Sequence, residues 1–239
     1  MSSPLSYSAA VAEPAGQVLV QIRELTKSYR RGDEVIRVFD NVNLDIRRGE
    51  YLSLMGPSGS GKSTLLNILA GLDSAEHGVV AVDGLEITRM KAGPLAAWRA
   101  THIGFIFQFY NLLPVLTAAQ NIELPLLLTS LSKQQRRDHV ATMLEVVGLT
   151  DRGSHFPGQL SGGQQQRVGV SRAIVSDPTI ILADEPTGDL DAASGEEILN
   201  LLDRLNREFH KTILVVTHDA NAAARAQATM HLDKGVLSR

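Results

Sequence analysis

The chain has 239 residues, of which 44% are apolar and 5% aromatic, with a formal net charge of −3 and no cysteine. This length and composition are typical of one globular domain, or of one domain with a sizeable insertion, which can fold without disulfides or structural metals. The lack of cysteine excludes a disulfide scaffold, a thiol nucleophile and a cysteine-ligated zinc site, and the slightly acidic balance argues against a broad basic surface for nucleic acid.

The first 17 residues are rich in serine, alanine and proline. They lack the basic start and apolar core of a signal peptide, so we expect a flexible tail over residues 1–17. The most apolar stretches, residues 122–128 and 213–216, are far shorter than the ~18 residues that a membrane-spanning helix requires. If the protein acts at a membrane, we therefore expect a partner to supply the span.

The first third of the chain is predicted to form short strands around one apolar helix. Strands are predicted at residues 19–25, 35–46 and 51–55, a helix at residues 64–71, and a hairpin of residues 79–82 and 85–87. In the second strand Val42, Leu44 and Ile46 alternate with polar residues, which is the period of a half-buried strand. Asp83-Gly84 supplies the hairpin turn.

The middle of the chain is predicted to be helical. Candidate capping boxes at helix starts are Thr117 with Gln120 and Ser132 with Gln135. We expect a helical insertion over residues 93–159, and with the following helix the helical subdomain spans residues 93–176. The later elements are a strand at residues 180–183, a helix at 191–209, a strand at 213–216, a short helix, and two edge strands around residues 234–235. This alternation predicts an α/β fold with a largely parallel sheet covered on both faces.

The strongest functional motif is a P-loop at residues 56–63, Gly-Pro-Ser-Gly-Ser-Gly-Lys-Ser. It follows a predicted strand and opens a predicted helix, which is the context that this motif requires. Its glycines let backbone amides surround phosphate oxygens, and the helix start adds donors and a favourable dipole. Lys62 is expected to reach the β- and γ-phosphates, and the Ser63 hydroxyl to ligate Mg²⁺. The expected nucleotide contacts are Gly56, Pro57, Ser58, Gly59, Ser60, Gly61, Lys62, Ser63 and Thr64.

An acidic element is expected beside the P-loop. Residues 180–184 read Ile-Ile-Leu-Ala-Asp, an apolar strand that ends in a carboxylate, and Glu185 follows. Because side chains alternate along a strand, Asp184 and Glu185 cannot both face one metal ion. We assign Asp184 to Mg²⁺, and Glu185 to the attacking water as a general base or water-orienting group. The alternative is an acidic turn before Pro186.

A glycine-rich helix start lies at residues 160–164, Leu-Ser-Gly-Gly-Gln. Its amides either receive a phosphate, or Ser161 and Gln164 only cap an apolar helix. Together with the P-loop and the Asp184-Glu185 pair, this segment resembles the signature of the ATP-binding cassette (ABC) family. The resemblance covers residues 18–238. It implies a P-loop NTPase fold with a mostly parallel core sheet, an antiparallel β subdomain and the inserted α-helical subdomain, so that residues 18–239 form one ABC ATPase domain.

The resemblance also implies roles for single residues. Tyr29 matches the aromatic residue that stacks on adenine; the alternative is a strand-end tyrosine. Gln108 matches the glutamine that meets Mg²⁺ and the attacking water; the alternative is a polar loop residue. His218 matches the histidine that bonds the γ-phosphate, although a histidine after an apolar strand is often structural, and residues 188–191 match the loop at the subunit boundary. The expected catalytic residues are Glu185, His218 and Gln108, and the expected Mg²⁺ ligands are Ser63, Gln108 and Asp184.

The family architecture implies a head-to-tail homodimer. Each ATP would lie between the P-loop of one subunit and Ser161, Gly162, Gly163 and Gln164 of the other. The sequence agrees in one respect, because it has two phosphate-binding helix starts but one P-loop lysine and one Asp-Glu pair, so two copies could share each nucleotide. ATP would then hold the dimer together, and hydrolysis would release it.

Longer matches point to one subfamily. The stretches at residues 56–73, 105–114 and 183–188 resemble cassettes of the lipoprotein-release and macrolide-export type, which pair with a permease and perform mechanical work. By analogy, the segment from Phe109 to Pro114 and the helix after Thr117 would receive the permease. This requires that Phe109, Tyr110, Leu112 and Leu113 are exposed rather than packed into the core of the insertion. Residues 155–159 depart from that subfamily.

The sequence therefore predicts an ATP hydrolase that uses ATP and Mg²⁺ and drives a separate membrane permease. We expect a homodimer on the cytoplasmic side of the inner (plasma) membrane, held there by the permease, with no nucleic-acid partner. The competing hypothesis is a soluble ABC-type switch that remodels protein or nucleic acid without a permease. A permease that co-purifies with the chain would decide between the two.

Overall fold

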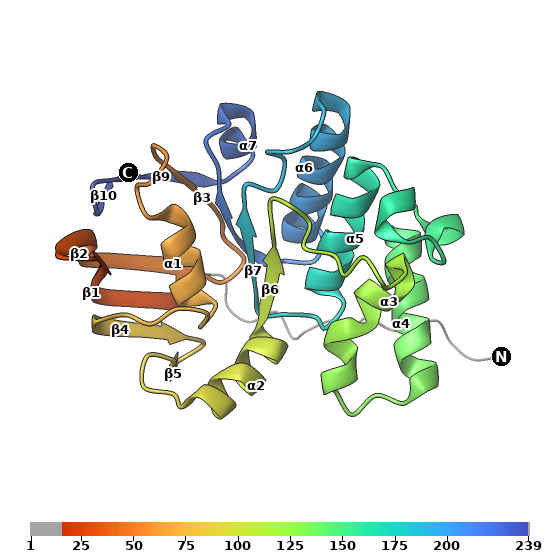
Figure 1. The fold of residues 1–239 in the computed structure, drawn as a ribbon, viewed down its shortest axis with the longest axis horizontal. Coiled ribbons are helices and arrows are strands. Elements are labelled where there is room, and N and C mark those ends of the chain that lie inside the picture. Colours follow the sequence, from red (N-terminus) through yellow and green to blue (C-terminus); the bar gives the residue numbers. More distant parts are fainter. Residues whose placement is uncertain (1–15, 239) are drawn as a thin grey trace.

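Two β-sheets organise residues 16–238, the part of the chain that the computed structural model describes (Figure 1). The predicted tail lies outside this part except for residues 16 and 17. The first sheet is four-stranded and antiparallel, in the order β2-β1-β4-β5. Its strands are β1 (Val18–Arg31), β2 (Glu34–Arg47), β4 (His77–Val82) and β5 (Leu85–Glu86).

The second sheet is six-stranded and mostly parallel, in the order β10-β9-β3-β8-β7-β6. Within it, the β9–β10 pair is antiparallel and the other neighbours are parallel. Its strands are β3 (Tyr51–Met55), β6 (Ile103–Ile106), β7 (Ile180–Asp184), β8 (Thr212–Val216), β9 (Ala228–Asp233) and β10 (Val236–Ser238). The two sheets confirm the predicted combination of a mainly parallel core with an antiparallel β part.

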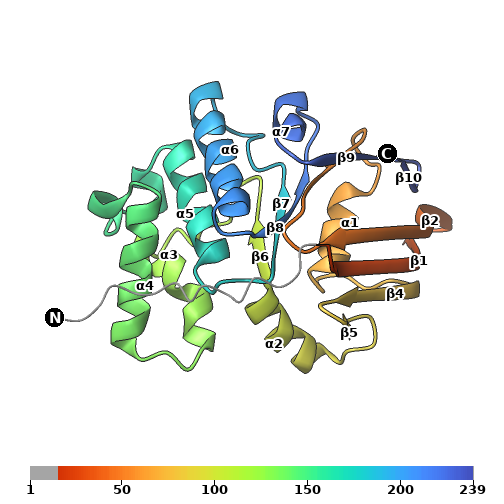
Figure 2. The ribbon, with the colours of Figure 1, turned by 180° about the vertical axis from the view of Figure 1, so that it is seen from behind.

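Helices pack on both faces of the second sheet. The α-helices are α1 (Lys62–Leu69), α2 (Ala92–His102), α3 (Ala118–Glu123), α4 (Lys133–Val146), α5 (Gly162–Ile174), α6 (Ala192–Arg207) and α7 (Ala220–Ala224). Short 3-10 turns add η1 (Leu124–Leu128), η2 (Thr150–Arg152) and η3 (Pro157–Gln159). In both views the first sheet lies at one end of the molecule, and α3 with α4 lies at the other (Figures 1 and 2).

Alternation along the parallel strands divides the interior into two cores. Leu182 and Leu214 face the core that contains α1 and the first sheet. Ile181 and Ile213, their chain neighbours, face the core that contains α5 and α6. Because both faces of β7 and β8 are covered, these strands are apolar at nearly every position, as the sequence predicted. Because β7 is buried on both sides, its last residue, Asp184, is held in a fixed position.

Two predictions about the strands of the core sheet were wrong. The stretch expected to be a helical insertion contains β6, a strand of the core sheet that pairs with β7, so residues 93–159 are not helical throughout. The strands around residues 234–235 are not both at the edge, because β9 lies between β3 and β10. Both corrections follow from strand pairing, which the sequence of a four- to six-residue strand does not specify by itself. Within residues 16–238, no helix combines the length and apolarity that crossing a membrane would need.

Candidate active site

A cleft of about 760 Å³ opens where the parallel strands of the second sheet end. In open α/β sheets this edge is the usual place for a ligand. Separate segments line it: the end of β1 with the facing part of β2, the loop before α1, and the segments after β6, β7 and β8. The lining residues are Tyr29, Val38, Gly56, Pro57, Ser58, Gly59, Gly61, Lys62, Ser63, Thr64, Gln108, Asp184, Glu185, Val216 and His218.

The loop before α1 folds around its own lysine. Lys62 Nζ donates to the carbonyl oxygens of Gly56 (2.8 Å) and Pro57 (2.9 Å). Gly61, which precedes α1, has a φ of 102°, and a Cβ built there would lie 2.5 Å from Val38 Cγ1. Both backbone conformation and space therefore require glycine at this position. The loop is thus held in a curved form that brings the lysine and the first amides of α1 to the cleft.

A phosphate group fits this arrangement. The first amides of a helix have no partner within the helix, and they carry partial positive charge. Lys62 adds a full charge, and its backbone acceptors can be exchanged for phosphate oxygens, which bind an ammonium more strongly. Ser60 is placed differently from the other predicted contacts. Its hydroxyl is buried without a hydrogen-bond partner among the described residues and does not line the cleft, so its side chain lies behind the loop.

The two side chains assigned to Mg²⁺ from the P-loop and the strand end are in contact. Ser63 Oγ donates to Asp184 Oδ1 at 3.1 Å. Burial raises the pKa of Asp184, and the charge of Glu185 adds to that rise, while the Ser63 hydrogen bond and the charge of Lys62 oppose it. Hydroxyl and carboxylate oxygens are the ligands that Mg²⁺ prefers. A divalent cation would also offset the cost of the buried carboxylate, so the residues present fit such an ion.

Glu185 turns away from Asp184 and pairs with His218. It has a φ of 46°, a left-handed conformation that is uncommon for a residue with a side chain. Glu185 Oε1 lies 2.8 Å from His218 Nδ1, and the His218 amide donates to Glu185 Oε2 at 3.4 Å. Because a carboxylate only accepts, Nδ1 carries the proton in this contact. The glutamate side chain is 15% exposed and the imidazole 72%, so the histidine extends into the cleft from a mostly buried acid.

Gln108 lines the same cleft, and a buried glutamine that sequence reasoning missed holds its surroundings. Gln166 of α5 is fully buried and donates to the carbonyl oxygens of Phe107 (3.2 Å) and Pro186 (2.6 Å). It thereby joins the residue before Gln108 to the residue after Glu185. Gln166 follows two other glutamines in the sequence, and no local pattern distinguishes it from them.

Tyr29 of β1 also lines the cleft, with 42% of its surface exposed. Its hydroxyl donates to Asp73 Oδ2 at 2.5 Å. Sequence reasoning did not single out Asp73, nor the cleft residues Val38 and Val216. Apolar strand residues carry no chemical signature, and the contact with Asp73 joins segments 44 residues apart.

The residues at the start of α5 lie apart from this cleft. Ser161 Oγ accepts from the Gln164 amide (3.3 Å) and Gln164 Oε1 accepts from the Ser161 amide (3.0 Å), so the capping box exists. None of the residues from Ser161 to Gln164 lines the cleft of its own chain. Instead, a Cβ at Gly163 would lie 2.6 Å from Ser194 Oγ, which shows that the start of α5 packs against the start of α6. The predicted nucleotide contacts therefore form two separate groups in one chain.

A single arginine joins α5 to the segment after Gln108. Arg172 donates to the carbonyl oxygens of Asn111 (2.6 Å) and Tyr110 (2.7 Å). Both of those residues are left-handed, with φ of 48° and 59°. The Tyr110 hydroxyl also donates to Asp189 Oδ2 at 3.2 Å, in the loop before α6. The last turn of α5, the segment after Gln108 and the loop before α6 are thus joined by hydrogen bonds.

Comparisons with known proteins agree with this geometry. A family model described as "ABC transporter" matches residues 39–188. The chain is 45% identical over 225 residues to the uncharacterized ABC transporter ATP-binding protein MJ0796 of Methanocaldococcus jannaschii, covering 92% of this chain and 96% of that protein. A solved dimeric structure of MJ0796, bound to ADP and Pi, matches with a TM-score of 0.86 at 44% identity over 92% of this chain and 97% of that one.

Similarity also extends to larger proteins. The macrolide export ATP-binding/permease protein MacB 1/2 of Paracoccus denitrificans is 49% identical over 220 residues, which cover 92% of this chain. The chain spans only 33% of the length of that relative, in contrast to nearly all of MJ0796.

Proposed function

Because the chain belongs to the ABC transporter family and is an ATP-hydrolysing domain of that family, we propose that it drives a separate membrane permease of the lipoprotein-release and macrolide-export type. The observation that carries the ATPase part of this proposal is the cleft, which joins a phosphate-binding loop, a Ser63–Asp184 pair and a Glu185–His218 pair. The similarity to MacB and MJ0796 supports the transporter class.

The residues of the cleft divide the chemistry of ATP hydrolysis between them. Lys62 and the first amides of α1 would bind the phosphates and stabilise the charge that develops during transfer. Glu185 would orient the attacking water and accept its proton. His218, whose Nδ1 bonds Glu185, would contact the terminal phosphate through Nε2, so that one ring links the base to the bond that breaks. Gln108, beside this pair, would contact the same water.

Ser63, Asp184 and Gln108 would hold Mg²⁺. There the ion would neutralise part of the negative charge of the phosphates. The Ser63–Asp184 contact keeps both ligands near the loop before the ion arrives.

The separation of Ser161, Gly162, Gly163 and Gln164 from the cleft supports a homodimer. The two glycines at this helix start suit a phosphate, yet no nucleotide in the cleft of the same chain would meet them. In a head-to-tail dimer they would contact the nucleotide held by the partner subunit. ATP would then stabilise the dimer, and cleavage of the terminal phosphate would remove the shared contact.

A permease would dock on the segment from Phe109 to Pro114, on the cytoplasmic side of the inner membrane. Phe109 is 67% exposed and Leu113 46%, as this surface requires. Tyr110 and Leu112 are half-buried instead: Tyr110 bonds Asp189, and Leu112 packs on the core beside α5. The exposed apolar surface is therefore narrower than the sequence suggested.

The chemistry is tested with Glu185→Gln, which keeps the side-chain shape but removes the base. We expect ATP binding to persist, turnover to fall by about 100-fold or more, and a dimer to accumulate with ATP in light scattering. Lys62→Ala is the matched control and should neither hydrolyse ATP nor dimerise with it. Normal turnover by Glu185→Gln would remove Glu185 from its proposed role.

The transporter role is tested by recovery of an integral membrane protein with the tagged chain from detergent-solubilised membranes. We expect Phe109→Glu to abolish the recovery and to retain ATP hydrolysis. Val236→Glu is the control, because Val236 is 64% exposed on β10, at the edge of the second sheet opposite to β6, the strand that leads into the segment from Phe109 to Pro114. Recovery of no membrane protein, or equal loss with both variants, would contradict the proposed docking surface.

A further inference from the structure

We propose that Asp73 is a positioning residue for the nucleotide base: with Lys27, it fixes the ring of Tyr29 so that the exposed part of the ring receives the base. This inference rests on the proposed binding of ATP in the cleft. Asp73 itself does not line the cleft, so it would act through Tyr29 and not by contact with the nucleotide.

The Asp73 carboxylate is shared by three donors. Its Oδ2 accepts from the Tyr29 hydroxyl at 2.5 Å. Its Oδ1 accepts from Lys27 Nζ at 2.7 Å and from the Ser74 amide at 2.7 Å. Lys27 Nζ also donates to the Ser74 carbonyl oxygen at 2.7 Å. The turn after α1 and the end of β1 are therefore joined by a closed set of hydrogen bonds, in which Asp73 is the only carboxylate.

Lys27 holds one face of the Tyr29 ring. Its side chain is 8% exposed, and its Nζ lies 4.8 Å from the centroid of the Tyr29 ring, over the ring. An ammonium over an aromatic face is attracted by the electrons of the ring. With the hydroxyl held by Asp73 and one face held by Lys27, neither torsion of the Tyr29 side chain is free. The exposed remainder of the ring borders the cleft.

The same contacts set the protonation states that the arrangement needs. Burial tends to raise the pKa of Asp73, but the hydrogen bonds from Lys27, Tyr29 and Ser74 outweigh it, and the pKa falls below its usual value. Burial and the bond to Asp73 raise the pKa of Tyr29, while the Thr64 hydroxyl, in the first turn of α1, bonds the phenol and opposes that rise. Asp73 thus stays an acceptor and Tyr29 a donor at neutral pH. Thr64 also ties the ring to the helix that begins at the phosphate site.

Fixing the ring of Tyr29 matters because a base stacks on a face of the ring, and that face must be turned toward the base. An aromatic residue that stacks on a base gains affinity from contact area, and it loses part of that gain if the ring must first be immobilised. A ring that is already held by Asp73 and Lys27 avoids that loss. The phosphates, which bind to the loop before α1, would not depend on it.

The test compares ATP with inorganic tripolyphosphate in calorimetric titrations of the full chain. Asp73→Asn replaces one carboxylate oxygen by an NH2 group that donates, so when its oxygen accepts from Lys27, the Tyr29 hydroxyl loses its acceptor. We expect it to weaken ATP binding by about 2- to 10-fold, the effect of one side chain that is no longer fixed. Tripolyphosphate affinity should stay unchanged. Tyr29→Phe, which removes only the hydroxyl, should reproduce this result even if Asp73→Asn folds poorly.

Tyr29→Ala completes the set. We expect it to weaken ATP binding by about 5- to 150-fold, as for the loss of one base stack, and Asp73→Asn should add nothing in the double variant. Equal losses for ATP and tripolyphosphate with Asp73→Asn would show a general structural role and overturn the proposal, as would independent effects in the double variant. If instead Lys62→Ala binds ATP as tightly as the unaltered chain, the proposed nucleotide site itself fails.

Discussion

Two aspartates near the cleft show how surroundings set the charge of a single side chain. Asp184 is buried beside Glu185, and its pKa lies above the usual value. Asp73 accepts hydrogen bonds from Lys27, Tyr29 and Ser74, and its pKa lies below the usual value. The ionised form of Asp184 therefore opposes folding, whereas the ionised form of Asp73 favours it.

For Asp184→Asn, we expect a higher melting temperature without nucleotide at pH 8. The native pKa of Asp184 exceeds its unfolded value, so its cost is absent at low pH and develops as the pH rises through the native pKa. Because the side chain is partly exposed, screening keeps the gain on the order of 1–3 °C. The gain over the unaltered chain should disappear as the pH falls to about 4. A gain that does not depend on pH would contradict this account.

Asp73→Asn should change the melting temperature in the opposite direction. The native pKa of Asp73 is lowered, so its stabilisation is present above the unfolded pKa and is lost as the pH falls through the native one. We therefore expect a lower melting temperature than that of the unaltered chain at pH 8, with a difference that narrows in acid. Thermal melts across pH, followed by circular dichroism, check both variants in one series.

Motifs indicated the candidate reactive side chains, but not the residues that hold them. The P-loop spacing indicated Lys62 and Ser63, and the strand end indicated Asp184; the structure brings all three to one cleft. Asp73 and Gln166 were missed. Their partners lie 44 and 20 or more residues away in the chain, and only tertiary packing brings them together.

Among the helices and strands, local rules worked where the chain itself supplies the partner. The predicted capping boxes at Thr117, Ser132 and Ser161 are all present, and Asp83-Gly84 joins β4 to β5. A capping box needs only residues three apart. β6 and the inner position of β9 were missed, because each depends on a neighbouring strand that lies far away in sequence.

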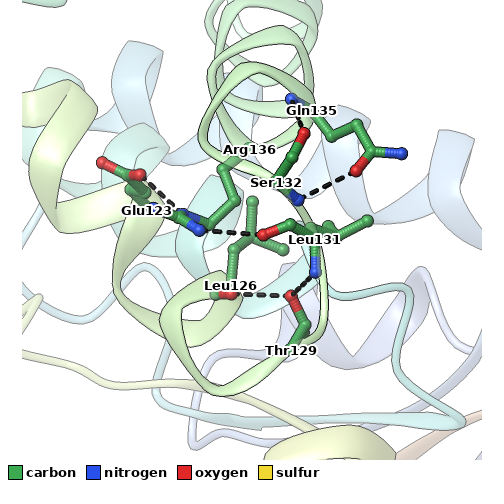
Figure 3. Close-up of polar contacts among 7 residues, drawn as sticks. All are labelled: Glu123, Leu126, Thr129, Leu131, Ser132, Gln135 and Arg136. Atoms are coloured by element: carbon green, nitrogen blue, oxygen red, sulfur yellow. Dashed lines mark hydrogen bonds and ion pairs between the residues drawn. The ribbon is translucent and has the colours of Figure 1, made fainter.

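The turn between η1 and α4 allows a test of one such cap (Figure 3). Ser132 Oγ accepts from the Gln135 amide at 3.3 Å, and Gln135 Oε1 accepts from the Ser132 amide at 2.9 Å. Arg136 adds a bond to the Leu131 carbonyl oxygen and an ion pair with Glu123 at 2.9 Å. We expect Ser132→Ala to lower the free energy of unfolding by about 1 kcal/mol in urea, with an unchanged m value.

The control for this cap is Ser132→Thr, which keeps a hydroxyl acceptor and should retain most of the stability. ATP turnover should be unaltered in both variants, because Ser132 does not line the cleft. A loss as large for threonine as for alanine would show that the hydroxyl is not the source of the stabilisation.

The predicted nucleotide contacts form two separate groups in one chain. In an assembled dimer, two variants that each damage a different group should therefore complement one another. Lys62→Ala impairs the cleft but leaves the start of α5 intact, and Ser161→Arg obstructs the start of α5 but leaves the cleft intact. We expect each variant alone to be inactive. In their mixture a mixed dimer would contain one complete site, so ATP hydrolysis should reappear.

The complementation assay has a direct control. Lys62→Ala mixed with the double variant Lys62→Ala/Ser161→Arg contains no intact cleft and should stay inactive. If Ser161→Arg alone hydrolyses ATP at the normal rate, or if the first mixture stays inactive while both variants are folded, the site is not shared between two copies.

The bonds from Arg172 to the carbonyl oxygens of Tyr110 and Asn111 have a consequence for force transmission. A load applied to the exposed Phe109 would pass through the adjoining backbone into the last turn of α5. The first residues of the same helix are those proposed to contact the nucleotide of the other copy. The Arg172 bonds hold this path at the last turn of α5, and the 13-residue helix would carry the displacement from there to its first residues. The same linkage works in reverse: when the first residues of α5 lose their phosphate contact, the resulting shift of the helix would displace Phe109.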